Sequence, residues 1–188
     1  MTKVDVLFNG YAGDRVAGTV SLVRDGDTTA IIDPGMVPHR AVILDPLAAL
    51  GVVPDDVTDV ILSHHHPDHT TNIALFPNVR VHDHWAIYKK DRWISRPAEG
   101  FRVSEHITLT ETPGHTPQDI TTLVRAGDVV FAFTHLWWGE AFSDDPRATQ
   151  PELLQPNLDR VREMATSIVP GHGSPSAAAA APRMGAGR

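Results

Sequence analysis

The sequence predicts a single domain that contains both helices and strands, of the α/β (α+β) class. Three observations predict it: strand-like apolar runs come first, strand–loop–helix units follow, and further strands lead to one late helix. The 188 residues are 41% hydrophobic, enough to bury a core, and no repeat or internal linker divides them. We therefore expect one domain over residues 1–174, followed by a flexible Ala/Pro/Gly-rich tail, residues 175–188.

Strands are expected where short runs rich in Val, Ile, Leu and Thr lie between turn residues. The turn Asp25-Gly26-Asp27, for example, separates two such runs and predicts a hairpin. The expected strands are residues 3–8, 19–24, 28–33, 59–63, 79–82, 101–103, 107–111, 119–124, 129–135 and 167–169.

Helices are expected where a capping residue precedes a run of helix formers. Asp45 followed by Pro46 predicts a short helix that Gly51 ends. Asp83 predicts the start of another short helix, which runs to Lys90. The remaining expected elements are helices over residues 68–75 and 150–165, the latter broken by Pro151 and Pro156, and a Gly-containing loop over residues 9–17.

Composition limits the class of function. The chain has no cysteine, so any metal must be held by nitrogen and oxygen donors. No run approaches the ~20 apolar residues of a membrane span, and the first residues lack an apolar signal region, which favours a cytoplasmic protein without a membrane partner. A net charge of -7 and the lack of a basic run disfavour nucleic acid as a partner. The sequence leaves open whether the protein forms a homo-oligomer.

The stretch His64-His65-His66-Pro67-Asp68-His69 is the most informative part of the chain. Three imidazoles and a carboxylate directly follow an apolar strand, where a loop aims side chains at one point. Pro67 forbids helix through His66, so His64 and His66 face the same way on extended backbone, while Asp68 and His69 turn onto the next element. Such a set suits a divalent metal, with zinc the default and iron or manganese as alternatives.

Three more histidines follow expected strands. His115 and His172 lie in Pro-Gly-His loops, where glycine allows close backbone approach, and His135 ends the strand at 129–135. Each alone is an ordinary surface or core histidine, but two ions need about six or seven donors. We therefore expect these three to join the cluster.

The residues His64, His66, Asp68 and His69 match the HxHxDH signature of the metallo-β-lactamase-fold hydrolases, which this chain resembles to about residue 174. The resemblance implies a four-layer αβ/βα sandwich of two mixed β-sheets. It also implies two metal groups, with Asp33 as a structural support beside the ligand loop. By this resemblance His64, His66 and His115 hold one ion, and Asp68, His69 and His172 hold the other.

A closer resemblance, to the subfamily of metallo-β-lactamase-domain-containing protein 1, rests on local motifs. Animal members of that subfamily are associated with RNA processing. The motifs are Leu75-Phe76-Pro77, Thr112-Pro113-Gly114-His115-Thr116-Pro117-Gln118-Asp119 and Val169-Pro170-Gly171-His172-Gly173.

One position departs from the family pattern, which has a Gly-Asp whose carboxylate bridges both metals. Asp128 follows a glycine, but it lies 13 positions after His115, which leaves room for one strand instead of the two that the family has. Placing Asp128 in a hairpin turn puts His135 at the end of the returning strand. We therefore assign the bridging position to His135. The alternatives are a bridge from Asp128, or a single-metal site from which His135 points away.

Further residues are candidates for the substrate pocket and the cleft beside the metal ligands. Trp137 and Trp138 follow His135 and are candidates for a hydrophobic substrate pocket, although adjacent tryptophans are core residues about as often. Tyr11, in the first loop, is a further candidate pocket contact. Five histidines are left out of the cluster, and one of these, His84, is the candidate for lining the cleft; they are His39, His65, His82, His84 and His106.

These observations predict a metal-dependent hydrolase that uses a metal-bound hydroxide, with Asp68 as the catalytic residue that orients water and carries protons. The expected substrates are small esters, lactones or thioesters. One alternative is a phosphodiesterase or nuclease acting on RNA or DNA, and another is a metal-binding protein with little hydrolytic activity. No cofactor beyond one or two divalent ions is expected.

Overall fold

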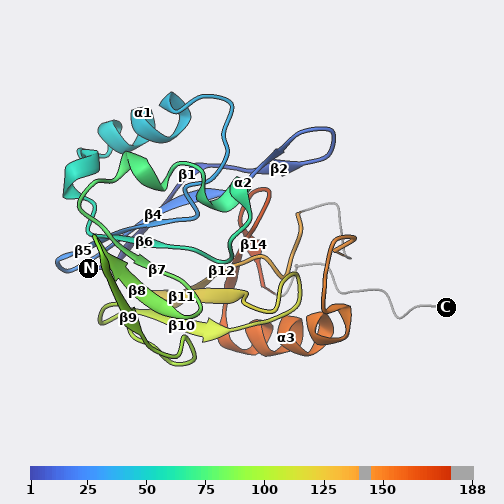
Figure 1. Cartoon of the computed structure of the whole chain (residues 1–188). Helices are drawn as coiled ribbons and strands as arrows, with labels where there is room; N and C mark the ends of the chain where they lie inside the picture. The colour runs from blue at the N-terminus through green and yellow to red at the C-terminus, as the bar shows by residue number, and fades with distance from the viewer. Residues whose placement is uncertain (140–144, 179–188) are drawn as a thin grey trace.

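The computed structural model describes residues 1–139 and 145–178, and two β-sheets with helices on their outer sides make up the fold (Figure 1). Helix α1 (Ala41–Ala49) covers one side and helix α3 (Pro151–Met164) covers the opposite side. The order of layers is helix, sheet, sheet, helix. The predicted class and the two mixed sheets are confirmed.

The first sheet has seven strands among the described residues, in the order β1-β4-β5-β6-β7-β8-β9. It is mixed, because β6 pairs in parallel with both β5 and β7 while the other pairs are antiparallel. The strands are β1 (Lys3–Phe8), β4 (Val20–Asp25), β5 (Thr28–Ile32), β6 (Asp59–Ile61), β7 (Arg80–His82), β8 (Ala86–Lys89) and β9 (Arg92–Ser95).

The second sheet has the order β10-β11-β12-β13-β14 within the described residues, and only its β12–β13 pair is parallel. Its strands are β10 (Ile107–Glu111), β11 (Ile120–Ala126), β12 (Val129–Thr134), β13 (Ser167–Pro170) and β14 (Ser176–Ala177).

Smaller elements complete the described chain. Strands β2 (Tyr11–Ala12) and β3 (Val16–Ala17) form a short hairpin in the segment expected to be an irregular loop. Helix α2 (Pro67–Thr70) contains Asp68 and His69, and the 3-10 turns are Pro54–Asp56 and Ile73–Leu75. No helix in the described parts of the chain is long and apolar enough to cross a membrane.

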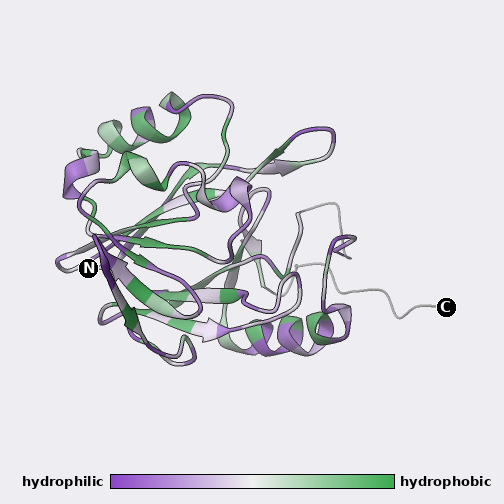
Figure 2. Cartoon of the chain, in the orientation of Figure 1, coloured by the Kyte–Doolittle hydropathy of each residue, from purple (hydrophilic) through white to green (hydrophobic). Residues whose placement is uncertain are grey.

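Three hydrophobic cores account for the four layers, because successive side chains of a strand point to opposite faces. In β4, Leu22 packs into the core beneath α1, whereas Val23 packs into the core between the sheets. A third core lies between the second sheet and α3, where Leu154 and Leu158 are buried. Figure 2 shows the result: apolar residues follow the interior strands, and α3 carries both apolar and polar residues around its turns.

Two predicted helices are wrong in position or type. Helix α1 begins at Ala41 rather than at Pro46, which lies inside it, because Ile43 and Leu47 are spaced to bury on one face against the sheet. Residues 83–90 form no helix. Asp83 does accept backbone N–H bonds, from Trp85 and Ala86, but the chain then enters the β8–β9 hairpin. Its Ile, Tyr and Trp residues favour strand over helix.

Smaller differences concern the other expected elements. Residues 101–103 contribute one isolated bridge, between Arg102 and Thr108, instead of a strand. Helix α3 runs unbroken through Pro156. In the expected tail, β14 pairs with β13 and Ala178 is buried, while residues 179–188 lie outside the described residues. The domain boundary at residue 174 stays a prediction.

Asp59 is a buried carboxylate that ties together the two parallel strands β6 and β7. It accepts two hydrogen bonds from Arg80, at 2.8 and 3.0 Å, and one from Thr58, at 2.7 Å. The His82 ring lies 2.7 Å away. Burial alone would raise the pKa of Asp59, but the hydrogen bonds from His82, Arg80 and Thr58 outweigh it and lower this pKa to about 2.

We predict that Asp59→Asn lowers the free energy of unfolding at pH 7 by about 2 kcal/mol. The carboxylate stabilises the fold above its unfolded pKa of 3.8, and this stabilisation is lost as the pH falls through about 2. Urea unfolding at pH 7 and at pH 3 measures this stabilisation. The difference in the free energy of unfolding between wild type and variant should be smaller at pH 3 than at pH 7. Asp91→Asn, at the exposed β8–β9 turn, is the control, and an equal loss in both variants would contradict the prediction.

Candidate metal centre

The cluster residues nearest the N-terminus come from the segment between β6 and α2. His66 has extended backbone, as the sequence predicts, and α2 begins at Pro67, so His64 and His66 precede the helix while Asp68 and His69 lie within it. The helix expected over residues 68–75 ends at Thr70, and a separate 3-10 turn forms at Ile73–Leu75. Gly35 makes this arrangement possible, because any Cβ at that position would overlap the carbonyl oxygen of Asp68. The close approach of these two segments requires glycine.

The remaining cluster residues come from the second sheet. His115 lies between β10 and β11, His135 directly follows β12, and His172 follows β13. A Cβ at Gly171 would overlap the His135 ring, so glycine next to His172 serves the packing of its neighbour. All three rings are 1% exposed, so they face inward rather than solvent.

Two groups of ligand atoms form where the sheets meet. In the first group, His66 Nδ1 lies 3.0 Å from His64 Nε2 and 2.9 Å from His115 Nε2. In the second group, Asp68 Oδ2 lies 3.3 Å from His69 Nε2 and 3.5 Å from His172 Nε2.

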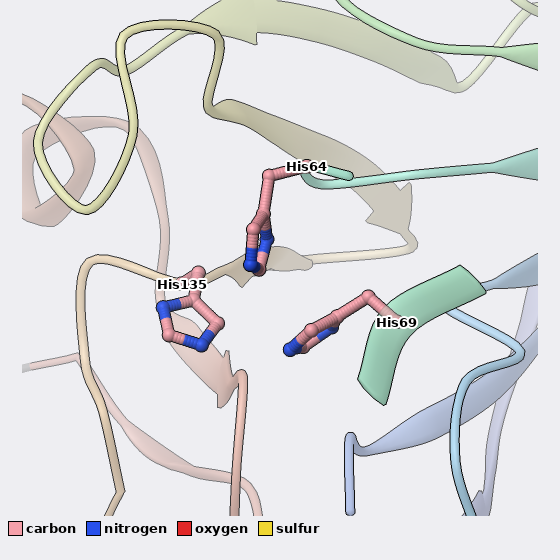
Figure 3. Close-up of side chains that lie close together, drawn as sticks. All are labelled: His64, His69 and His135. Carbon is pink, nitrogen blue, oxygen red and sulfur yellow. The ribbon is translucent and has the colours of Figure 1, made fainter. Parts of the chain in front are cut away.

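His135 lies between the two groups. Its Nε2 is 3.2 Å from His172 Nε2, and a ligand atom of its ring is within 4.8 Å of those of His64 and His69. Figure 3 shows these three imidazoles converging from the segment after β6, from α2 and from the segment after β12. The structure therefore brings together all seven residues that the sequence nominates as ligands.

Fixed partners set the proton positions of three rings. Nδ1 of His172 lies 2.9 Å from the carbonyl oxygen of Ala17, and Nδ1 of His69 lies 2.9 Å from Asp33 Oδ2. Nδ1 of His115 faces a carboxylate oxygen of Asp145. Because each partner only accepts, each Nδ1 carries a proton, and Nε2 of a ring in its neutral form presents a lone pair to the cluster.

Burial and crowding keep most of these rings neutral. Burial, together with the neighbouring histidines, holds the pKa values of His64 and His135 well below the ordinary value of 6.5. Burial lowers the pKa of His172 to about 4. Burial would also lower the pKa of His69, but the carboxylates of Asp33 and Asp68 outweigh it and raise this pKa to about 9. Of the rings with shifted pKa values, His69 is thus the one whose surroundings favour the charged form.

Two carboxylates outside the ligand set orient candidate ligands by contacting the Nδ1 atoms of their rings. Asp33 was nominated as a support, and it accepts a 2.7 Å hydrogen bond from the Ser63 backbone N–H besides contacting His69. Asp145 was missed. It lies 30 residues after His115 in sequence, and no local motif marks it; besides facing His115, it accepts a 2.8 Å hydrogen bond from the Arg147 backbone N–H.

The rival bridging residue lies outside the cluster. Asp128 is exposed in the two-residue turn between β11 and β12, where Gly127 has a φ of 63°. His135 stands at the end of the returning strand, inside the cluster. The assignment of His135 to the bridging position depends on this arrangement, with Asp128 in the turn and His135 at the end of the strand.

A pocket of about 350 Å³ opens beside the cluster. His66, Asp68, His115 and Trp138 line it. Tyr11 is not among the lining residues, and Trp137 is buried in the core against α3, 3% exposed. Of the three expected pocket residues, the structure thus places only Trp138 there.

The histidines left out of the cluster contact other groups or solvent. His65 Nε2 lies 3.0 Å from Asp83, His82 faces Asp59 and His106 faces Asp25. His39 is exposed. His84, the candidate for lining the cleft, packs against Trp85 and does not line the pocket.

The four layers and the histidine cluster agree with the comparison with known families: residues 13–174 match the model of the metallo-beta-lactamase superfamily, and the chain belongs to this family. The chain is accordingly a metal-dependent hydrolase, and its cluster fits metal binding.

Individual relatives span most of the chain. Metallo-beta-lactamase domain-containing protein 1 of Xenopus laevis is 31% identical over 192 residues, covering 92% of this chain and 80% of the relative. A putative metallo-beta-lactamase of Thermotoga maritima superposes with a TM-score of 0.72 at 21% identity, covering 94% of this chain and 99% of that one. The dizinc quorum-quenching lactonase AidC superposes with a TM-score of 0.62 at 17% identity, covering 82% and 72%.

We predict that His66→Ala removes most of the bound metal and abolishes activity. His66 is the exposed member of the first group, so its loss removes a ligand without leaving a core cavity. Elemental analysis against protein concentration measures the metal. His65→Ala is the matched control, because the neighbouring ring points to Asp83 and its loss should leave metal content unchanged. Stoichiometric metal retained in His66→Ala would count against the assignment.

Proposed function

We propose that this protein hydrolyses a small ester, lactone or thioester at a two-metal centre, and that zinc is the resident metal. The observation that carries the proposal is the pocket, which opens directly onto candidate ligands of both groups, His66, His115 and Asp68. A pocket of about 350 Å³ is at the small end of those that enclose small molecules.

The donor set fits divalent ions. In the first group, His66 Nδ1 lies 3.0 and 2.9 Å from the nitrogens of His64 and His115, close to the roughly 3.3 Å spacing of ligands around a tetrahedral zinc. Nδ1 of His135 is buried without a hydrogen-bond partner among the described residues. A buried lone pair that no donor satisfies is what a cation would compensate.

The proposed ligand groups are His64, His66 and His115 for one ion, and Asp68, His69 and His172 for the other, with His135 between them. When bound, the ions would supply the Lewis acidity that activates water and polarises the scissile carbonyl. With nitrogen and oxygen donors alone, zinc is favoured over softer metals, in keeping with its default place among histidine-rich sites.

Asp68 is the proposed catalytic residue. Burial would raise its pKa, but the hydrogen bond from His69 and the charge of that ring outweigh it and lower the pKa to about 2. The side chain is therefore ionised at neutral pH, and it lines the pocket. In this position the carboxylate can orient a water molecule and accept its proton.

A substrate panel tests the proposal. Zinc-loaded protein should turn over simple esters, lactones or thioesters, and Asp68→Asn should lower kcat/KM by about 10²–10⁴-fold. The panel also contains a phosphodiester and a β-lactam at equal concentration. Hydrolysis of the phosphodiester alone would contradict the proposal, as would the absence of any turnover at full metal occupancy.

We also predict unequal metal affinities in the wild type. A neutral His135 between two dications provides no negative charge to offset their repulsion, so one ion should survive mild chelation and the other should be lost. His135→Asp should raise the occupancy of the weaker group, as measured by elemental analysis after dialysis against a chelator.

Asp128→Ala is the control for this prediction. Its side chain is exposed in the β11–β12 turn, so metal content should not change. Loss of metal in Asp128→Ala would overturn the assignment of His135 and favour an aspartate-bridged centre.

A further inference from the structure

Two arginines from distant parts of the chain line the pocket beside the metal centre. Arg15 lies in the turn of the β2–β3 hairpin, and Arg147 lies in the segment before α3. Both side chains are exposed. Neither guanidinium forms an ion pair with a residue in the described parts of the chain, so their hydrogen-bond donors are available to a ligand.

Each guanidinium lies near an aromatic ring that supports it. Arg147 is 5.9 Å from the centre of the Trp138 ring, and Arg15 is 5.6 Å from that of Tyr11. Such contacts restrain an arginine side chain while its N–H edge stays free to bind a planar anion with two parallel hydrogen bonds. A supported arginine loses less conformational freedom on binding than one that extends alone into solvent.

Arg147 is also linked to the metal centre. One oxygen of Asp145 accepts the Arg147 backbone N–H at 2.8 Å, and the other oxygen faces Nδ1 of His115. The same carboxylate therefore sets the position of an arginine backbone at the pocket and the orientation of a candidate metal ligand.

The local charge differs from that of the whole chain. The protein has a net charge of -7, yet the pocket lining outside the metal centre carries two arginines against one exposed carboxylate, Asp14. Two cationic side chains in one pocket attract an anion. A substrate with an anionic group would supply that charge.

We propose that the substrate carries an anionic group, a carboxylate or a phosphate, which Arg147 and Arg15 bind while its scissile carbonyl lies at His66, Asp68 and His115. This inference rests on the proposed hydrolysis of a small ester, lactone or thioester. The apolar part of the substrate packs on Trp138, which lines the pocket between the metal ligands and Arg147.

The first test compares two thioesters that differ only in charge, S-acetyl-3-mercaptopropionate and its neutral amide, S-acetyl-3-mercaptopropanamide. Zinc-loaded wild type should hydrolyse the acid with a kcat/KM about tenfold higher, mainly through a lower KM. Arg147→Gln and Arg15→Gln should each reduce this preference, measured as the ratio of the two kcat/KM values, and the double variant should abolish it. Arg92→Gln, on the exposed strand β9, removes the same charge outside the pocket and should keep the preference.

The second test measures binding without turnover. Replacing the thioester sulfur by methylene gives 5-oxohexanoate, with 5-oxohexanamide as its neutral control and 4-oxopentylphosphonate as the phosphate-like arm. Calorimetry should show about tenfold tighter binding of the better anion than of the amide, and the arginine double variant should lose this difference. The ratio of the affinities for the two anions shows whether the site prefers a carboxylate or a phosphate.

The two tests separate the inference from the proposed function. Equal affinity for the anions and the amide in the wild type would overturn the anion site, and so would a preference that survives in the double variant. Anion-selective binding that depends on the arginines supports the site even if neither thioester is hydrolysed, an outcome that would count against the proposed hydrolysis alone.

Discussion

The cluster depends on how the two sheets are fastened at their strand ends. Backbone hydrogen bonds cross from one sheet to the other beside the cluster, from Ile120 to Ser63 at 2.9 Å and from Thr19 to Gly171 at 2.8 Å. His172 adds a side-chain bond to Ala17. Since seven polar side chains converge from both sheets, a small slip of one sheet would separate them, and these bonds oppose such a slip.

Local sequence predicted most strands within a residue or two, because apolar alternation and turn residues are local signals. Local sequence did not predict the elements whose position or type depends on which residues become buried. Helix α1 starts before Asp45-Pro46 because its buried side chains, Ile43 and Leu47, need the earlier turn to face the sheet. The β8–β9 hairpin shows the converse: the hydrogen bonds of Asp83 resemble a helix cap, but the residues that follow favour strand.

The candidate ligands were predictable because histidine after a strand is an uncommon pattern, and repetition of it in one chain is informative. Asp145 and the two pocket arginines were not predictable, because none of them carries a motif of its own. Asp145 faces a histidine 30 residues away, and only the fold brings Arg15 and Arg147 to one pocket. The pair Trp137 and Trp138 illustrates the same limit. Adjacent residues point opposite ways at a loop, and only the fold shows that Trp138 faces the pocket while Trp137 enters the core.

Asp33 is one of two non-glycine residues with a positive φ among those described, at 52°. This conformation costs free energy for an aspartate, and it places one carboxylate between the Ser63 backbone and the His69 ring. The segment from Ser63 to His69 is thereby closed into a loop by the protein alone. Metal binding then need not order the chain, so ions could be removed and restored without unfolding, unlike in small domains whose fold forms around zinc.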